Sequence, residues 1–279
     1  MYDWPEVADD LDVLWALVVG AAGERGVVLP DRLSRAPHDV LWRDPGLVVG
    51  QVCALNPARD GLGRTVVIGS LALEPPPGLP DPGPGTYYSV VVARADDARL
   101  ASARAGAPHE VLGVGRASAA VTRFAGARVA ATATDSQSGY WSLGGFVHHL
   151  TERGPLFGEA LMTGAHRASV AAVAEGRADL AAIDVHSWRL ACEHEPALTS
   201  RLAVVGLTEP TAGIVCVTST EHARHRAALD AALADAVGRY TATPHAARTH
   251  VTGYRTAELD EFRPIAERAA ATAGRPWHA

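Results

Sequence analysis

Short apolar runs, each ending at a polar turn, recur along the chain and predict buried β-strands. Runs at 47–53, 65–73 and 87–93 are rich in β-branched residues and have the length of strands. Between residues 96 and 195, similar runs alternate with helical patterns. Alternation of this kind is typical of a parallel sheet with helices on both faces, so the pattern indicates an α/β fold.

Helical patterns lie near both ends of the chain. Apolar positions recur at helical spacing from Val7 onward and predict a helix that ends at about Ala22, with Asp3 as its cap. Alanine-rich stretches predict two more helices at about 221–237 and 256–273. We expect the helix that ends at about Ala22 to pack on a sheet.

The order of the elements predicts two lobes. Strands expected at 202–206 and 213–217 follow the alternating region and precede the last helices. The first lobe is expected to contain residues 1–94 and 207–279, and the second to contain residues 95–206. A ligand cleft is expected between them.

Three turns in the second lobe carry the candidate chemistry. Ser136–Tyr140 follows an apolar run and begins a helical segment, and Thr163–Ser169 and Ala178–Asp184 lie at further junctions of strand and helix. The start of a helix presents N–H groups that have no intrahelical partner, and nearby hydroxyls can donate to the same point. The three turns therefore predict one oxyanion pocket.

The charge and composition exclude several classes of protein. A formal net charge of -6 gives no basic footprint for nucleic acid. All 25 basic residues are arginine, which excludes lysine Schiff bases, lysine-anchored pyridoxal phosphate and a Walker-type nucleotide loop. We therefore expect neither a cofactor nor a nucleic-acid partner.

Cysteine and histidine spacing predicts no metal site. The three cysteines have no paired zinc spacing, and none of the twelve histidines belongs to a complete set of zinc ligands.

The apolar stretch Val13–Ala22 is too short to span a bilayer. The start of the chain lacks the basic residues of a secretory signal, so as written it is expected in the cytoplasm, or outside it if a leader was removed.

These motifs, in this order, resemble the phosphate, phosphite and phosphonate substrate-binding proteins of ABC transporters. That family has the type II periplasmic-binding-protein fold. The resemblance implies a small oxyanion held between two lobes, an ABC permease as partner, and no catalysis. The residues that carry it are Tyr2–Glu6, Gly50–Cys53, Tyr87–Arg94, Ser136–Tyr140, Thr163–His166 with Ala168 and Ser169, Ala178–Asp184, Thr208, and Thr218 with Ser219.

The resemblance also implies the ligand contacts. The second lobe would provide the turn at residues 136–140 (the serine turn), the histidine, and an aspartate that accepts a proton from the ligand. The first lobe would provide aromatic or amide side chains. The implied contacts are Ser136, Ser138, Gly139, Tyr140, His166 and Asp184, with Gln51, Tyr88 and Tyr2 in the first lobe.

Alternatives stay open at this point. Ser136 and Asp184 are also suited to plain helix capping without a ligand. Ser138, His166 and Asp184 are the residue types of a hydrolase triad, but the serine lacks the Gly-x-Ser-x-Gly turn. A cytosolic lyase or dehydratase on the same fold, or a cytoplasmic ligand sensor, would have a similar sequence.

Overall fold

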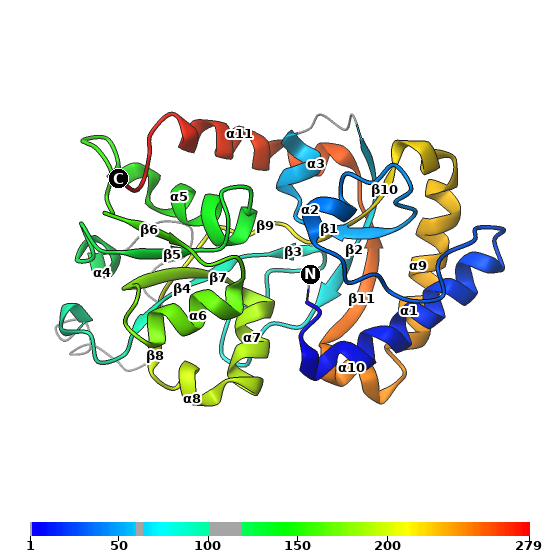
Figure 1. Ribbon diagram of the computed structural model, residues 1–279, viewed down its shortest axis with the longest axis horizontal. Coiled ribbons are helices and arrows are strands. Elements are labelled where there is room, and N and C mark those ends of the chain that lie inside the picture. The colour runs from blue at the N-terminus through cyan, green and yellow to red at the C-terminus, as the bar shows by residue number, and fades with distance from the viewer. Residues whose placement is uncertain (1, 60–63, 101–118) are drawn as a thin grey trace. The chain divides into compact units, whose positions relative to one another are not determined.

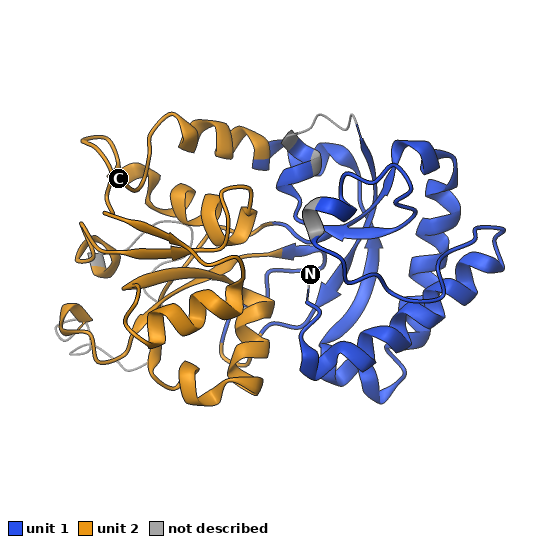
Figure 2. Cartoon of the chain, viewed as in Figure 1, with its two compact units in different colours: residues 1–75, 79–86, 212–265 blue, residues 76–78, 87–211, 266–279 orange. Residues whose placement is uncertain are grey.

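The chain forms two compact units in the computed structural model, which describes residues 2–59, 64–100 and 119–279 (Figures 1 and 2). Unit 1 contains residues 1–75, 79–86 and 212–265, and unit 2 contains 76–78, 87–211 and 266–279. The division differs from the expected lobes because residues 76–78, 87–94, 207–211 and 266–279, which include strand β4 (Ser89–Arg94), belong to unit 2. Strand β4 pairs on both sides with strands of unit 2, which accounts for its place there.

Unit 1 is built on an antiparallel sheet of four strands in the order β1-β10-β2-β11. Every neighbouring pair in this sheet is antiparallel. The strands are β1 (Gly50–Val52), β2 (Thr65–Leu73), β10 (Val215–Ser219) and β11 (Val251–Thr256), and the helices are η1 (Pro5–Val7), α1 (Ala8–Gly23), α2 (His38–Leu41), α3 (Leu55–Arg59), η6 (Thr220–His225), α9 (Arg226–Tyr240), α10 (Pro244–Thr249) and η7 (Leu259–Phe262).

Helices α1 and α9 pack against each other and, with β2, enclose the core of unit 1 (Figure 1). Ala21 and Ala232 are fully buried where the helices meet, so their small side chains let the helices approach closely. Ile68 on β2 and Leu229 on α9 fill the space between the sheet and the helices. The expected packing of the first helix on a sheet is thus confirmed.

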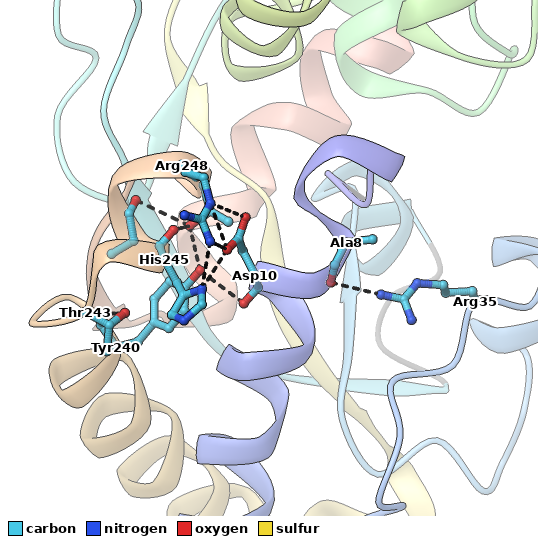
Figure 3. A network of polar contacts seen from close by, with 9 residues as sticks. Ala8, Asp10, Arg35, Tyr240, Thr243, His245 and Arg248 are labelled. Atoms are coloured by element: carbon cyan, nitrogen blue, oxygen red, sulfur yellow. Dashed lines mark hydrogen bonds and ion pairs between the residues drawn. The ribbon is translucent and has the colours of Figure 1, made fainter.

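A buried carboxylate joins three helices of unit 1. Asp10 on α1 is 2% exposed, and its Oδ1 lies 2.7 Å from Nδ1 of His245. Arg248 donates from Nε to both carboxylate oxygens, at 3.0 and 2.9 Å. The hydroxyl of Tyr240, at the end of α9, donates to the Asp10 carbonyl at 3.2 Å. The network holds α1, α9 and α10 together (Figure 3).

Two expectations for unit 1 were wrong. Asp3 caps no helix: Trp4 stands at the N-cap position, and the Asp3 carboxylate accepts from Nε of Arg35 at 2.7 Å. The helix expected from residue 256 begins only at Arg263, because Thr256 ends strand β11 and residues 259–262 form the 3-10 helix η7. Pairing with β2 supplies that strand with hydrogen bonds that an isolated segment would lack.

Unit 2 is built on a five-stranded sheet in the order β6-β5-β7-β4-β8. Helix α11 (Arg263–Ala273) begins in unit 1, and most of its length belongs to unit 2. The other strands are β5 (Val129–Ala131), β6 (Ala160–Met162), β7 (Leu180–Asp184) and β8 (Leu202–Leu207), and the helices are η2 (Ala98–Leu100), α4 (Ala119–Thr122), η4 (Gln137–Trp141), α5 (Ser142–Val147), η5 (His148–Leu150), α6 (His166–Ala174), α7 (Val185–His194) and α8 (Pro196–Thr199).

The sheet of unit 2 is mixed rather than parallel. Strand β5 runs parallel to β6 and β7, whereas β4 runs antiparallel to β7 and β8. The chain reaches β4 through the short strand β3 (Thr86–Tyr87), which pairs with β9 (Thr211–Ala212), and no crossover helix sets its direction. The expected parallel arrangement is therefore correct only for β5, β6 and β7.

Candidate functional site

The three predicted turns follow three parallel strands of unit 2. Because β5, β6 and β7 are parallel, their carboxyl ends lie at one edge of the sheet, where ligands of open α/β sheets bind. The serine turn (residues 136–140) follows β5, His166 follows β6, and Asp184 ends β7. The antiparallel β4 begins at the same edge, since Ser89 pairs with Asp184.

The serine turn begins its helix with a wide π-helical turn. The first intrahelical bond runs from the N–H of Trp141 to the carbonyl of Ser136, a step of five residues. An α-helix would close after four residues, so this turn leaves one more amide ahead of its first bond. The side chain of Ser136 accepts from the N–H of Gly139 at 3.0 Å and caps the turn.

Close packing at Gly139 fixes the serine turn against the end of β5. A Cβ at this position would lie 2.1 Å from Oγ1 and 2.9 Å from Cβ of Thr132. Only glycine fits there, because the Cβ of Thr132 is fixed by its backbone. The hydroxyl of Thr132 is buried and has no hydrogen-bond partner among the described residues.

A hydrogen bond joins the first two predicted turns. The Oγ of Ser138, a residue 2% exposed, lies 2.8 Å from Nε2 of His166. The backbone N–H of Asp184 lies 3.4 Å from Nδ1 of the same imidazole. The structure therefore brings Ser138, His166 and the end of β7 together, as the sequence predicted for a single site.

Burial lowers the pKa of His166 to about 4, and a hydrogen bond to the backbone of Ala182 opposes this shift. The imidazole is therefore uncharged at neutral pH. It interacts with an anion through a hydrogen bond rather than through a positive charge.

The lowered pKa of His166 predicts a loss of stability in mild acid. In the unfolded chain an imidazole takes up its proton near pH 6.5, whereas the folded protein resists protonation until about pH 4. The free energy of unfolding should fall as pH drops through this interval. Chemical denaturation at several pH values measures this free energy. It should depend less on pH in His166→Gln than in the wild type over this interval. An identical pH dependence in the two proteins would show that His166 is not the cause.

Asp184 acts as a helix cap in the structure. The side chain is fully buried, and its Oδ1 accepts from the backbone N–H groups of His186 and Ser187 at 2.9 and 3.0 Å. This is the capping role that the sequence left open as an alternative. The contact with His166 comes from the Asp184 amide, so these bonds do not reproduce the carboxylate–imidazole relay of a hydrolase triad.

The two candidate tyrosines in unit 2, Tyr88 and Tyr140, are largely enclosed. The hydroxyl of Tyr140 lies 2.8 Å from Nε2 of His278, and burial raises the pKa of this tyrosine above its ordinary value. Tyr88 is 3% exposed and lies between β3 and β4, where its carbonyl accepts from the N–H of Val185. Their expected contact with a ligand stays a prediction.

The remaining candidates belong to unit 1. Tyr2 is 7% exposed and precedes η1, where its carbonyl accepts from the N–H of Trp4. Gln51 lies in β1, and its carbonyl accepts from the indole N–H of Trp42 at 3.3 Å. Neither residue is part of the cluster in unit 2, and their role in binding also stays a prediction.

Two further serines, which the sequence patterns did not indicate, support the serine turn through hydrogen bonds to its backbone. The hydroxyl of Ser89 donates to the carbonyl of Ser138 at 2.9 Å, and Ser142 donates to the same carbonyl. The backbone N–H of Ser89 is in turn held by Oγ1 of Thr208 at 2.9 Å. Ser89 and Thr208 lie in motifs that carried the resemblance, but nothing local in the sequence indicated these contacts.

No group of three or more histidine, cysteine or acidic side chains suited to a metal ion occurs in the described part of the chain. Within the same residues, no helix has the length and apolar character needed to cross a membrane.

A sequence model of the family described as "ABC transporter, phosphonate, periplasmic substrate-binding protein" matches residues 72–262. The chain belongs to this family. The match spans the serine turn, His166 and Asp184, and it confirms the resemblance predicted from the motifs. Family members are substrate-binding proteins rather than enzymes, and membership implies a small anionic solute and an ABC permease. No curated protein sequence matches the chain.

Solved structures of similar proteins confirm the type II periplasmic-binding-protein fold. PhnD1 from Prochlorococcus marinus in complex with methylphosphonate has a TM-score of 0.66 at 15% identity, over 94% of this chain and 93% of that one. The binding-protein component PA3383 of an ABC phosphonate transporter from Pseudomonas aeruginosa has a TM-score of 0.66 at 13% identity, over 95% of this chain and 82% of that one. XAC2383 from Xanthomonas citri bound to ATP has a TM-score of 0.64 at 15% identity, over 96% and 94%. At these identities the likeness concerns the fold.

Proposed function

We propose that this protein captures a phosphonate or a closely related phosphorus oxyanion at the serine turn and presents it to an ABC permease outside the cytoplasm. Membership of the phosphonate-binding family supports the class of ligand. The observation that carries the location is the 2.8 Å bond between Ser138 and His166, which joins two of the three turns at the carboxyl edge of the sheet.

The serine turn provides donors without a formal charge. The Gly139 amide donates to Ser136, whereas the amides of residues 137, 138 and 140 also precede the first intrahelical bond. The positive end of the helix dipole favours an anion there. Gly139 lets the turn pack closely against Thr132 at the end of β5, which fixes the position of these amides. The hydroxyl of Ser138 is the natural donor to one oxygen of the ligand, once it leaves Nε2 of His166.

His166 and Asp184 have different roles in this proposal. A neutral imidazole with a proton on Nε2 donates a hydrogen bond to a second ligand oxygen and needs no change of charge. Asp184 begins α7 and orients the ring through its backbone amide. Its buried carboxylate is the expected reason for rejecting fully ionised sulfate, which has no proton to share.

Calorimetric titration tests the proposal directly. Methylphosphonate, aminoethylphosphonate, phosphite, phosphate and sulfate should be titrated into the purified protein at pH 7. We expect saturable binding of at least one phosphorus compound and none of sulfate. Absence of binding for every phosphorus compound would reject the proposed ligand class.

Loss of either hydrogen-bond donor should weaken binding strongly. Ser138→Ala and His166→Ala are each expected to raise the Kd of the best ligand by about tenfold or more, the equivalent of one hydrogen bond to a charged group. Ser200→Ala and His225→Ala are controls, because Ser200 follows helix α8 and His225 ends η6, so neither residue belongs to the three turns. Unchanged affinity in both Ser138→Ala and His166→Ala would place the ligand elsewhere.

A further inference from the structure

The final segment of the chain, residues 275–279, docks on the part of unit 2 that carries the serine turn. Its backbone binds beside Phe157: the N–H of Phe157 donates to the carbonyl of Trp277 at 3.0 Å, and the N–H of Ala279 donates to the carbonyl of Gly158 at 2.9 Å. Phe157 and His278 also form a parallel β-bridge. The segment therefore has a defined place in unit 2 rather than a loose one.

Trp277 anchors the segment in the core of unit 2. The side chain is 2% exposed and meets the rings of Tyr140 and Phe157 edge to face, with centroids 4.9 and 6.1 Å apart. A Cβ on Gly144 in α5 would lie 2.6 Å from Cδ1 of the indole, so the helix needs a glycine where it meets this ring. The indole thus packs directly against the helix that the serine turn begins.

His278 adds a directional contact. Its Nε2 lies 2.8 Å from the hydroxyl of Tyr140, and the two rings meet at 84° with centroids 5.6 Å apart. Tyr140 follows Gly139 in the π-helical turn, so its ring and its backbone amide are both constrained. The ring of Tyr140 packs against Trp277, and its hydroxyl bonds to His278. These two contacts together restrict the orientation of the Tyr140 ring.

We propose that Trp277 and His278 are positioning residues, which hold Tyr140 so that the amides of the serine turn keep their ligand-binding geometry. This inference rests on the proposed oxyanion site and adds to it a contribution from a segment more than a hundred residues away in sequence. The residues need not touch the ligand. They act because a π-helical turn is rare and needs support from its surroundings.

A double-mutant cycle on the Tyr140–His278 bond separates positioning from general packing. His278→Ala and Tyr140→Phe should each raise the Kd for methylphosphonate by roughly threefold to tenfold, the range of a single neutral hydrogen bond. The double variant should be no weaker than the weaker single variant, because both remove the same bond. His278→Gln, which keeps a polar side chain, should recover part of the affinity, and His225→Ala serves as the control for histidine loss.

Hydrogen exchange of the ligand-free protein gives a readout that does not depend on binding. Amides of residues 137–141 should exchange faster in His278→Ala than in the wild type, while those of β7 should not change. Wild-type affinity together with wild-type exchange in His278→Ala would overturn the inference. Failure of the wild type to bind any oxyanion would instead reject the proposed function, and the exchange comparison would still decide the positioning role.

Discussion

Gly139→Ala is expected to abolish oxyanion binding, with at least a hundredfold rise in Kd. The new Cβ would lie 2.1 Å from Oγ1, 2.7 Å from Cγ2 and 2.9 Å from Cβ of Thr132. Rotation of the threonine side chain relieves the first two contacts but not the third. The backbone of the serine turn must therefore move away from β5 and carry its amides out of position, and a shift of about 1 Å costs about a hundredfold in a preorganised site.

The control for this substitution lies in helix α5, which follows the serine turn. A Cβ on Gly145 meets nothing within 4 Å, so Gly145→Ala should bind like the wild type. Thr132→Gly removes the obstructing Cβ, so the double variant with Gly139→Ala should regain part of the lost affinity. Calorimetry on the four proteins measures this directly. Normal binding by Gly139→Ala would show that the geometry of this turn does not matter to the ligand.

Asp10→Ala is expected to produce the largest loss of stability, roughly 2–4 kcal/mol in the free energy of unfolding. The substitution removes the contacts of the Asp10 carboxylate with Arg248 and His245, which join α1 to α10 (Figure 3). Arg248 is more than half exposed, so water compensates part of the loss. Urea denaturation of the two proteins gives the difference, and a change below 0.5 kcal/mol would mean that the network adds little.

The stability difference between the wild type and Asp10→Ala should depend on pH in a way that identifies the carboxylate as its source. The hydrogen bond from Arg248 holds the pKa of Asp10 below its ordinary value of 3.8, with a smaller effect from His245. The stabilisation should be complete above about pH 5 and should disappear as pH falls through the lowered pKa. Asp12→Ala is the matched control on α1, because Asp12 is about half exposed and pairs with Arg35 at the surface. A difference that persists unchanged in acid would contradict the assignment.

The sequence predicted the proximity of the polar turns better than it predicted the pairing of the strands. Three polar turns after apolar runs were enough to expect a single site, and the bond between Ser138 and His166 joins two of them. Local patterns succeed here because turn chemistry depends on residues close in sequence. The direction of β4 and the existence of β11 depend on partners far along the chain, so no local pattern revealed them.

Finer features of the site were also beyond local reasoning. The π-helical turn is a shift of one residue in a hydrogen-bond ladder, and Ser, Gln, Gly and Tyr are equally compatible with an ordinary helix start. The support of the turn by Ser89 and His278 joins residues that are distant in sequence. The sequence did single out Gly139, but only the structure shows that Thr132 makes a glycine necessary there.

Hydrogen exchange with and without methylphosphonate tests the central claim most directly, since it reports on individual peptides of the intact protein. If the serine turn holds the oxyanion, saturating ligand should slow exchange most strongly in peptides that contain residues 137–141, and this protection should be absent in Ser138→Ala. Calorimetric binding without any protection of those peptides would contradict the account.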